Sequence, residues 1–172
     1  MIYDFQSLEE IFRQLPEDAA EHAAEVVNAH RRVFVYGAGR SGLMLKALAM
    51  RLSQAGRVVY VVGETVTPAI EAGDLLILAS ASGTTPNVCR YAKTAKAVGA
   101  DLLILTASVS SERTGISEAD VYFRAPNKDD GDTSGSLMGT LFEQALLLFF
   151  DQMVLYLKED PADMRKRHAN LE

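Results

Sequence analysis

VFVYGAGRSG at residues 33–42 is the stretch that decides the fold, and two more of the same kind follow it, VVYVVGETVTP at 58–68 and LLILASASGTT at 75–85. Each is a continuous apolar run that ends in a short polar loop. Continuous runs of aliphatic and β-branched residues are typical of parallel strands that helices cover on both faces. Because parallel strands end at the same edge of a sheet, where open α/β sheets bind ligands, the three loops are predicted to form one binding site.

The segments around these strands complete an alternating α/β order. Helices are predicted at 8–15, 17–28, 43–55 and 86–98, and further strands at 102–105 and 121–123. The order of strand, loop and helix implies right-handed crossovers, so we expect a three-layer αβα sandwich around a mainly five-stranded parallel sheet. Residues 1–172 are predicted to form a single domain, with leading helices in 1–30 and a C-terminal tail at 160–172.

The composition indicates which partners this protein is expected to bind and in which compartment it is expected to lie. The 17 Lys and Arg residues against 23 Asp and Glu give a net charge of −6, and no basic stripe lies along a predicted helix, so we expect no nucleic-acid partner. An anionic ligand would have to be held by local donors, because the overall field repels it. Cys89 is the only cysteine, and the N-terminus lacks the pattern of a signal peptide. A cytoplasmic protein without an internal disulfide is predicted.

Residues 139–159 are apolar on nearly every side of a predicted helix. Four polar residues interrupt the run, Glu143, Gln144, Asp151 and Gln152, so we do not expect it to span a membrane. The pattern instead predicts a helix buried in the core and in a subunit interface. The polar stretch before it, residues 124–136, is rich in Asp and Gly, which is typical of a mobile surface loop or a solvated connection.

Hydroxyl side chains dominate the third loop, which contains Ser80, Ser82, Thr84 and Thr85. The loop lies between a predicted strand and a helix that opens at Pro86, so hydroxyls and backbone N–H groups can converge on one dianion at the helix N-terminus. Ser41, at the start of the preceding helix, can join them. The alternative for any single residue is an ordinary turn or helix cap. As a set, the residues favour binding of a phosphorylated small molecule.

A dinucleotide site is the competing interpretation of the first loop. Residues 37–42 match the pattern G-x-G-x-x-G, and Glu64 lies 22 residues after Gly42, where an acid that binds a ribose would sit. A dehydrogenase of this length would lack a substrate domain, and the third loop would have no clear function. A small NAD-binding subunit therefore ranks below phosphate binding.

The chain resembles the sugar isomerase (SIS) domain in two loops, GRS at 39–41 and SASGTT at 80–85. Within that family it resembles the 6-phospho-3-hexuloisomerases in four segments, GAGRSG at 37–42, GETVTP at 63–68, MGTLFE at 138–143 and RHANLE at 167–172. The resemblance implies a flavodoxin-like fold and interconversion of 3-hexulose 6-phosphate and fructose 6-phosphate in the ribulose monophosphate pathway. It also implies catalysis without a cofactor or metal, in a homotetramer.

Two departures from the family pattern stand in the sequence. Ala81 replaces a glycine of the usual serine loop, which restricts the backbone but keeps the hydroxyls. The stretch KDDGD at 128–132 is acidic where the family is usually basic or neutral, and acidic charge near the site would disfavour a phosphate.

Isomerisation of a ketose needs a base that moves a proton and a group that stabilises the enediolate. Glu143 is the leading base, because an acid near the start of an otherwise apolar helix is suited to proton transfer; the alternative is an acid placed there by the helix dipole. Glu64 is the second carboxylate candidate, more suited to orienting loops or hydroxyls. Arg40 is expected to stabilise the enediolate or the phosphate, or else to form an ion pair with a surface acid.

His168 lies in the tail segment that the resemblance marks out. Imidazole can accept and donate a proton near neutral pH, so His168 is a candidate for proton transfer between substrate oxygens, in its own or a neighbouring subunit. The alternative is a tail residue without function. The competing function from another class is a non-catalytic SIS module that senses a sugar phosphate, which would have no use for a buried base.

Overall fold

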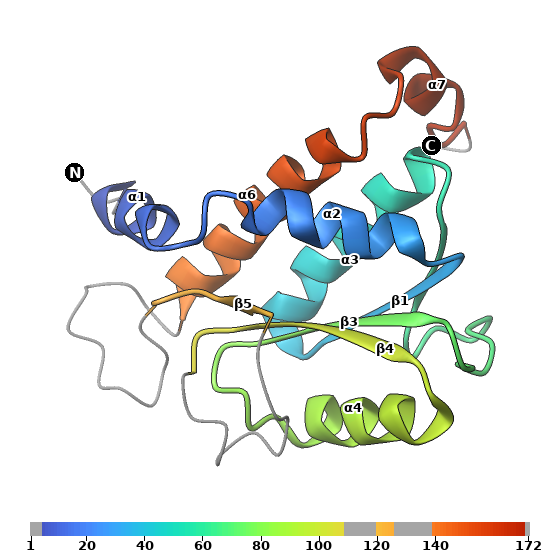
Figure 1. The fold of residues 1–172 in the computed structure, drawn as a ribbon, viewed down its shortest axis with the longest axis horizontal. Coiled ribbons are helices and arrows are strands. Elements are labelled where there is room, and N and C mark those ends of the chain that lie inside the picture. Colours follow the sequence, from blue (N-terminus) through green and yellow to red (C-terminus); the bar gives the residue numbers. More distant parts are fainter. Residues whose placement is uncertain (1–4, 109–119, 126–138, 171–172) are drawn as a thin grey trace.

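A five-stranded sheet, parallel throughout, is the centre of the fold (Figure 1). The computed structural model describes residues 5–108, 120–125 and 139–170. The strands lie in the order β2-β1-β3-β4-β5. Along the chain the elements are α1 (Phe5–Arg13), α2 (Ala19–Ala29), β1 (Arg32–Gly37), α3 (Gly39–Gln54), β2 (Val58–Val61), β3 (Leu75–Ser80), α4 (Pro86–Val98), β4 (Asp101–Thr106), β5 (Val121–Tyr122), α6 (Thr140–Tyr156) and α7 (Pro161–Lys166).

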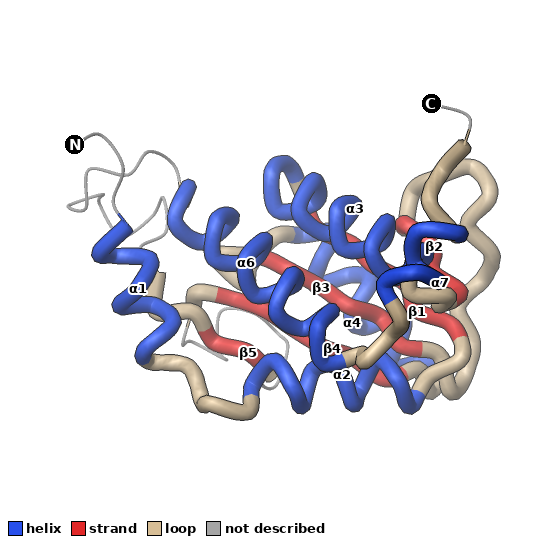
Figure 2. The backbone as a smooth tube through the Cα atoms, turned by 90° about the horizontal axis from the view of Figure 1, so that it is seen from above, coloured by secondary structure: helices blue, strands red, loops and turns tan. Residues whose placement is uncertain are grey.

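Helices cover both faces of the sheet, as the strand pattern predicts. Figure 2 shows α2, α3 and α6 on one face, and α4 on the other among the described residues. Successive strand residues point to opposite faces. Val33 and Val35 therefore join the core under α2, α3 and α6, whereas Phe34 joins the core under α4. The predicted αβα sandwich is confirmed.

Two glycines set the close contact between β1 and α3. A Cβ atom on Gly42 would lie 2.3 Å from Gly37 O, and one on Gly37 would lie 3.2 Å from Ala79 O in β3. The absence of these side chains lets the first turn of α3 pass directly over the ends of β1 and β3. As a result α3 begins at Gly39, four residues before the predicted start, and Arg40 and Ser41 belong to a helix and not to a loop.

Two predictions of burial need adjustment. β2 is an edge strand, so Val58 is exposed and the other three residues are only half-buried, although the run predicts helical cover on both faces. In α6 one side is buried against α1, α2 and α3, and the opposite side exposes Leu147, Leu148 and Leu155. The expected subunit interface on α6 is not tested by a single chain.

No helix in the described part of the chain is long and apolar enough to cross a membrane. The acidic segment 128–132 lies outside the described residues.

Asp74 forms a buried ion pair at the amino-terminal end of β3. Its carboxylate accepts hydrogen bonds from Arg32 Nε at 2.7 Å, from Arg32 Nη2 at 2.5 Å and from the backbone N–H of Glu71 at 2.7 Å. The hydrogen bonds from Arg32 hold the pKa of Asp74 below its ordinary value, which is about 3.9 in an unfolded chain. The carboxylate therefore adds stability above about pH 4 that is lost as the pH falls through its lowered folded-state pKa.

Replacing Asp74 with Asn should lower the melting temperature by several degrees at pH 7, because Arg32 loses its charged partner. The difference from wild type should shrink below about pH 4, where the carboxylate of the unfolded wild-type chain becomes protonated, and should vanish below the lowered pKa of the folded state. Thermal unfolding at a series of pH values measures this, with the exposed Asp18→Asn as a control. An equal loss in the Asp74 variant at pH 7 and at low pH would contradict the assigned role of this charge.

Candidate active site

A cleft of about 300 Å³ opens at the carboxyl ends of β1 and β3. Its volume is at the small end of the range for ligand pockets. The cleft is bounded by the end of β3 and residues 80–85, here called the serine loop, and by the first turns of α3 and α6. The lining residues are Ala38, Gly39, Ser41, Ala79, Ser80, Ala81, Ser82, Thr85, Gly139 and Glu143. The cleft therefore lies at the predicted edge of the sheet, but only the first and third of the three loops line it, and no residue of 63–68 does.

Hydroxyl groups hold the serine loop in shape. Ser80 Oγ lies 2.9 Å from Thr85 Oγ1 and accepts a hydrogen bond from Gly83 N–H at 3.1 Å. Ser82 Oγ accepts hydrogen bonds from Thr84 N–H at 3.3 Å and from the Thr84 hydroxyl at 3.1 Å. Ser80 is buried and its hydroxyl organises the loop, whereas Ser82 and Thr84 lie nearer to solvent. The loop leads into the N-terminus of α4, where unpaired N–H groups favour an anion.

Thr106 anchors this loop to the neighbouring strand. Its side chain is buried at the end of β4, opposite Ser80 in the strand register. Thr106 Oγ1 donates a hydrogen bond to Ser80 O at 2.7 Å and accepts one from Ser108 N–H at 3.1 Å. Sequence reasoning missed this residue, although a hydroxyl at the end of an apolar strand, LLILT at 102–106, is a signal that repeats the end of LLILAS at 75–80.

Glu143 and Arg40 meet at the rim of the cleft. Glu143 lies in the first turn of α6 with its side chain 11% exposed, and Arg40 lies in the first turn of α3 with its side chain 63% exposed. Arg40 Nε donates a hydrogen bond to Glu143 Oε2. Arg40 thus forms an ion pair, which the sequence predicts only as the alternative to substrate binding, but its partner is a shielded acid of the site and not a surface acid. Because Arg40 is mostly exposed, it can move from the carboxylate to an incoming anion without loss of packing.

Glu64 does not line this cleft. Its carboxylate receives a hydrogen bond from Lys46 Nζ at 2.8 Å, and both side chains are about half exposed. That hydrogen bond lowers the pKa of Glu64. The spacing that suggests a ribose-binding acid therefore leads instead to a surface ion pair in this structure.

His168 lies far from the cleft of its own chain. Arg167, the residue before it, donates a hydrogen bond from Nη1 to Gln54 O, at the end of α3, while Arg40 is at the start of that helix. A helix rises 1.5 Å per residue, so these two ends are roughly 21 Å apart. Figure 1 likewise places α7 at the opposite end of the sheet from the N-terminus of α6.

Residues 25–152 match the SIS domain family. The chain belongs to the SIS domain family. A 3-hexulose-6-phosphate isomerase of Mycobacterium gastri is 43% identical over 163 residues, which cover 91% of this chain and 81% of that protein. A 3-hexulose-6-phosphate isomerase of Bacillus subtilis is 39% identical, with 91% and 88% covered.

Solved structures share this fold over most of the chain. The crystal structure of a hypothetical protein from Methanococcus jannaschii, described as inferring a molecular function of 3-hexulose-6-phosphate isomerase, superposes with a TM-score of 0.82. It is 28% identical, and the match covers 97% of this chain and 94% of that one.

The cleft thus contains most of the side chains that the sequence analysis predicts as site residues. Ser41, Ser80, Ser82, Thr85 and Glu143 line it. Arg40 contacts Glu143 and Thr84 contacts Ser82 at its edge. Glu64 and His168 lie elsewhere.

Within residues 5–108, 120–125 and 139–170, no group of three or more His, Cys, Asp or Glu side chains could hold a metal ion.

Replacing Thr106 with Val should loosen the serine loop, because Ser108 N–H loses its side-chain acceptor and Ser80 O loses a donor. A buried hydrogen-bonding group left without its partner costs about 1–3 kcal/mol, so the free energy of unfolding should fall by that amount. Urea unfolding and amide hydrogen exchange at Ser108 measure the two effects. Thr106→Ser, which keeps the hydroxyl, is the matched control; equal behaviour of the Val and Ser variants would show that the hydroxyl does not anchor the loop.

Proposed function

We propose that this protein is a sugar-phosphate isomerase that interconverts 3-hexulose 6-phosphate and fructose 6-phosphate. The observation that carries the proposal is the shielded Glu143 carboxylate beside a loop of hydroxyls in one cleft. The names of the Mycobacterium gastri and Bacillus subtilis relatives support the choice of sugar. A binding module that only senses a sugar phosphate would not need a carboxylate in this place, so an enzyme is favoured.

The serine loop is the proposed phosphate site. Ser82 and Thr84 offer hydroxyls near solvent, and α4 directs its N-terminus toward the same loop. Ser80 and Thr85 shape the loop through the hydrogen bond between them, and Ser41 adds a hydroxyl from α3. Hydrogen bonds to a charged phosphate are stronger than neutral ones, which compensates for the net negative charge of the chain.

Proton transfer is the proposed role of Glu143. In the direction of fructose 6-phosphate, its carboxylate removes the proton from carbon 2, and the electron pair of that C–H bond forms the double bond of an enediolate between carbons 2 and 3. The proton then returns to carbon 3, and the carbonyl forms at carbon 2. The reaction is an oxidation of one carbon by its neighbour, so its electron balance needs no external oxidant or reductant.

Arg40 is the proposed partner of the negative charge that develops. In the structure its guanidinium neutralises Glu143. When a substrate enters, the same group can turn to the enediolate oxygen or the phosphate and leave the carboxylate free to accept a proton. Fixed charges near a developing oxyanion are among the largest contributions to catalysis.

A homo-oligomer, expected to be a tetramer in the cytoplasm, is proposed to complete the site. Exposed apolar side chains support it: Leu43 and Met50 on α3 are 57% and 49% exposed, and Leu155 on α6 is 77% exposed. The roughly 21 Å between the two ends of α3 separates His168 from the cleft of its own chain. We therefore propose that His168 acts in the cleft of a neighbouring subunit, where it moves a proton between the substrate oxygens.

The direct test is an assay of the purified protein with a panel of ketose and aldose 6-phosphates and without added cofactor. Wild-type protein should convert 3-hexulose 6-phosphate to fructose 6-phosphate. Glu143→Gln should lower kcat by about 100- to 10,000-fold, the usual contribution of a positioned base, while fructose 6-phosphate still raises the melting temperature of the variant. Glu64→Gln is the matched control and should keep its turnover.

Binding of the sugar phosphate with no conversion of any member of the panel would favour the sensing module. A normal kcat in Glu143→Gln together with a large loss in Glu64→Gln would transfer the role of base to Glu64.

Mixing two inactive variants tests whether His168 acts between subunits. His168→Ala and Glu143→Gln should each lose most of the activity, but mixed oligomers contain clefts with an intact Glu143 from one chain and an intact His168 from the other. After joint unfolding and refolding, the mixture should be far more active than either variant refolded alone. No recovery in a mixture shown to contain hetero-oligomers would place both residues in one subunit or remove His168 from the reaction.

A further inference from the structure

The chain makes an unusual turn between α6 and the C-terminal helix α7. Lys158 has φ of 57°, the only positive φ on a residue other than glycine in the described part of the chain. A side chain at this φ is crowded by its own backbone, so such a turn persists only where neighbouring contacts hold it. The next residue, Glu159, supplies those contacts.

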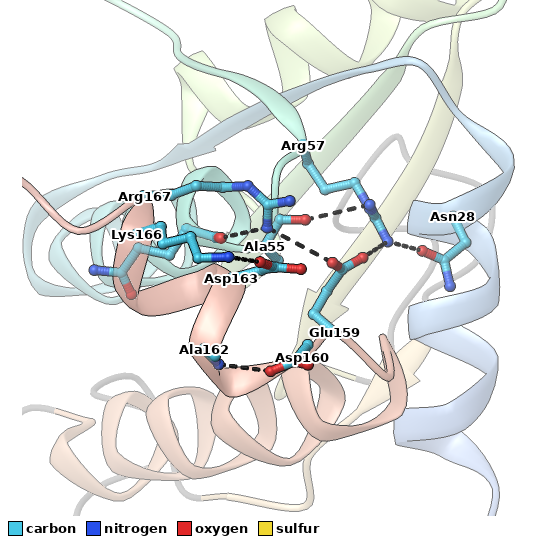
Figure 3. Close-up of polar contacts among 10 residues, drawn as sticks. Asn28, Ala55, Arg57, Glu159, Asp160, Ala162, Asp163, Lys166 and Arg167 are labelled. Atoms are coloured by element: carbon cyan, nitrogen blue, oxygen red, sulfur yellow. Dashed lines mark hydrogen bonds and ion pairs between the residues drawn. The ribbon is translucent and has the colours of Figure 1, made fainter.

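Glu159 is held between two arginines from different parts of the chain, as Figure 3 shows. Its Oε1 lies 2.9 Å from Nη2 of Arg57, and its Oε2 lies 3.7 Å from Nη1 of Arg167. Arg57 also donates to Asn28 Oδ1 at 2.7 Å, and Arg167 to Gln54 O at 3.1 Å. The three residues Arg57, Glu159 and Arg167 thus form a charged bridge from the tail to α2 and to the turn between α3 and β2.

None of the six residues of α7 is buried, and Met164 is the one apolar side chain of the helix that packs, partly buried, against the main core. Polar contacts add to this at both ends of the helix. Asp160 caps its N-terminus by accepting a hydrogen bond from Ala162 N–H at 2.7 Å. At its other end the guanidinium of Arg167 lies against Gly56, where an added Cβ would be 3.1 Å from Arg167 Cζ. The helix is therefore held at both ends, by Glu159 and by Arg167.

The charged bridge leaves one buried polar group without a partner in the described part of the chain, so its contribution to stability does not by itself account for it. Arg57 Nε is buried and has no hydrogen-bond partner among the described residues. A buried donor without a partner is unfavourable. The bridge also lies near the end of α3, roughly 21 Å from Arg40, so it cannot order the cleft of its own chain by direct contact. What it does fix is the residue that follows Arg167, the exposed His168.

We propose that the charged bridge is a positioning device for His168, and that Glu159 is its central positioning residue. The inference rests on the proposed function, and in particular on delivery of His168 to the cleft of a neighbouring subunit. With Glu159 between Arg57 and Arg167, α7 leaves the core in one direction and presents the histidine in one orientation. Without it, the helix keeps its own cap and the hydrogen bond from Arg167 to Gln54 O, but the tail loses its ion pair with Arg57.

Glu159→Gln tests the bridge, because it removes the charge and keeps the shape. We expect kcat to fall by about 10- to 100-fold, the usual cost of a misplaced catalytic group, with KM nearly unchanged. The melting temperature should fall by only about 2–4 °C, as for the loss of a partly exposed ion pair. Asp163→Asn is the matched control: it removes the ion pair with Lys166 inside α7 and should keep the wild-type kcat.

Two further measurements separate positioning from a general structural role. Glu159→Gln combined with His168→Ala should be no slower than His168→Ala alone, because both changes remove the same group. Mixed oligomers of Glu159→Gln and Glu143→Gln should regain activity, because the intact tail and the intact base come from different chains.

Additive losses in the double variant, or no recovery in the mixed oligomers, would overturn the proposal. So would a normal kcat in Glu159→Gln. An inactive wild-type protein would instead refute the proposed isomerase itself, so the two failures can be told apart.

Discussion

The close approach of Gly37 and Gly42 is the constraint on which the site depends. With 2.3 Å between Gly37 O and the position that a Cβ of Gly42 would take, the first turn of α3 can lie directly over the ends of β1 and β3. This contact brings Ser41 beside the serine loop and directs Arg40 toward the first turn of α6. Any larger side chain at either glycine would push α3 away from the sheet and open the cleft. Two residues that carry no functional group thus place Ser41 and Arg40 beside Glu143.

Polar groups at the two ends of α3 are organised for different purposes. At its N-terminus the Arg40 guanidinium covers a shielded carboxylate and can move, because most of it is in water. At its C-terminus Arg57, Glu159 and Arg167 are each less than half exposed and hold one another in place. A movable ion pair suits a site that must admit a charged substrate, whereas a fixed one suits a segment that must point in a constant direction. In the proposed oligomer, the tail that the fixed ion pairs hold in one subunit would carry His168 to the cleft at the N-terminus of α3 in another.

Much of the fold follows from local sequence. Strands β1, β3 and β4 are continuous apolar runs, and the glycines and proline around α4 mark its ends. The start of α3 could not be predicted correctly, because Gly39 and Gly42 are poor helix formers and only their tertiary contact with β1 explains a helix there. The pairing of Arg40 with Glu143 joins residues 103 positions apart, which periodicity cannot reveal. Glu64 shows the converse: a spacing that fits a dinucleotide site, the lower-ranked alternative, leads to an exposed ion pair with Lys46. Thr106 has a local signal, the hydroxyl that ends LLILT, whereas the ion pairs of Glu159 with Arg57 and Arg167 join separate segments and leave no short motif.

Exchange of the proton at carbon 3 of fructose 6-phosphate in heavy water measures proton abstraction by Glu143 directly, because it does not require full turnover. We predict that the wild-type protein replaces this proton with deuterium, because a carboxyl group that meets solvent between transfers exchanges its own proton. Glu143→Gln should still bind the sugar, but should exchange the carbon-3 proton at least 100-fold more slowly, since a general base contributes about that factor. Equal rates of exchange in the two proteins would contradict the assignment of Glu143, and interconversion of the sugars in wild type with no deuterium in the product would contradict an enediolate formed by a solvent-exchanging carboxylate.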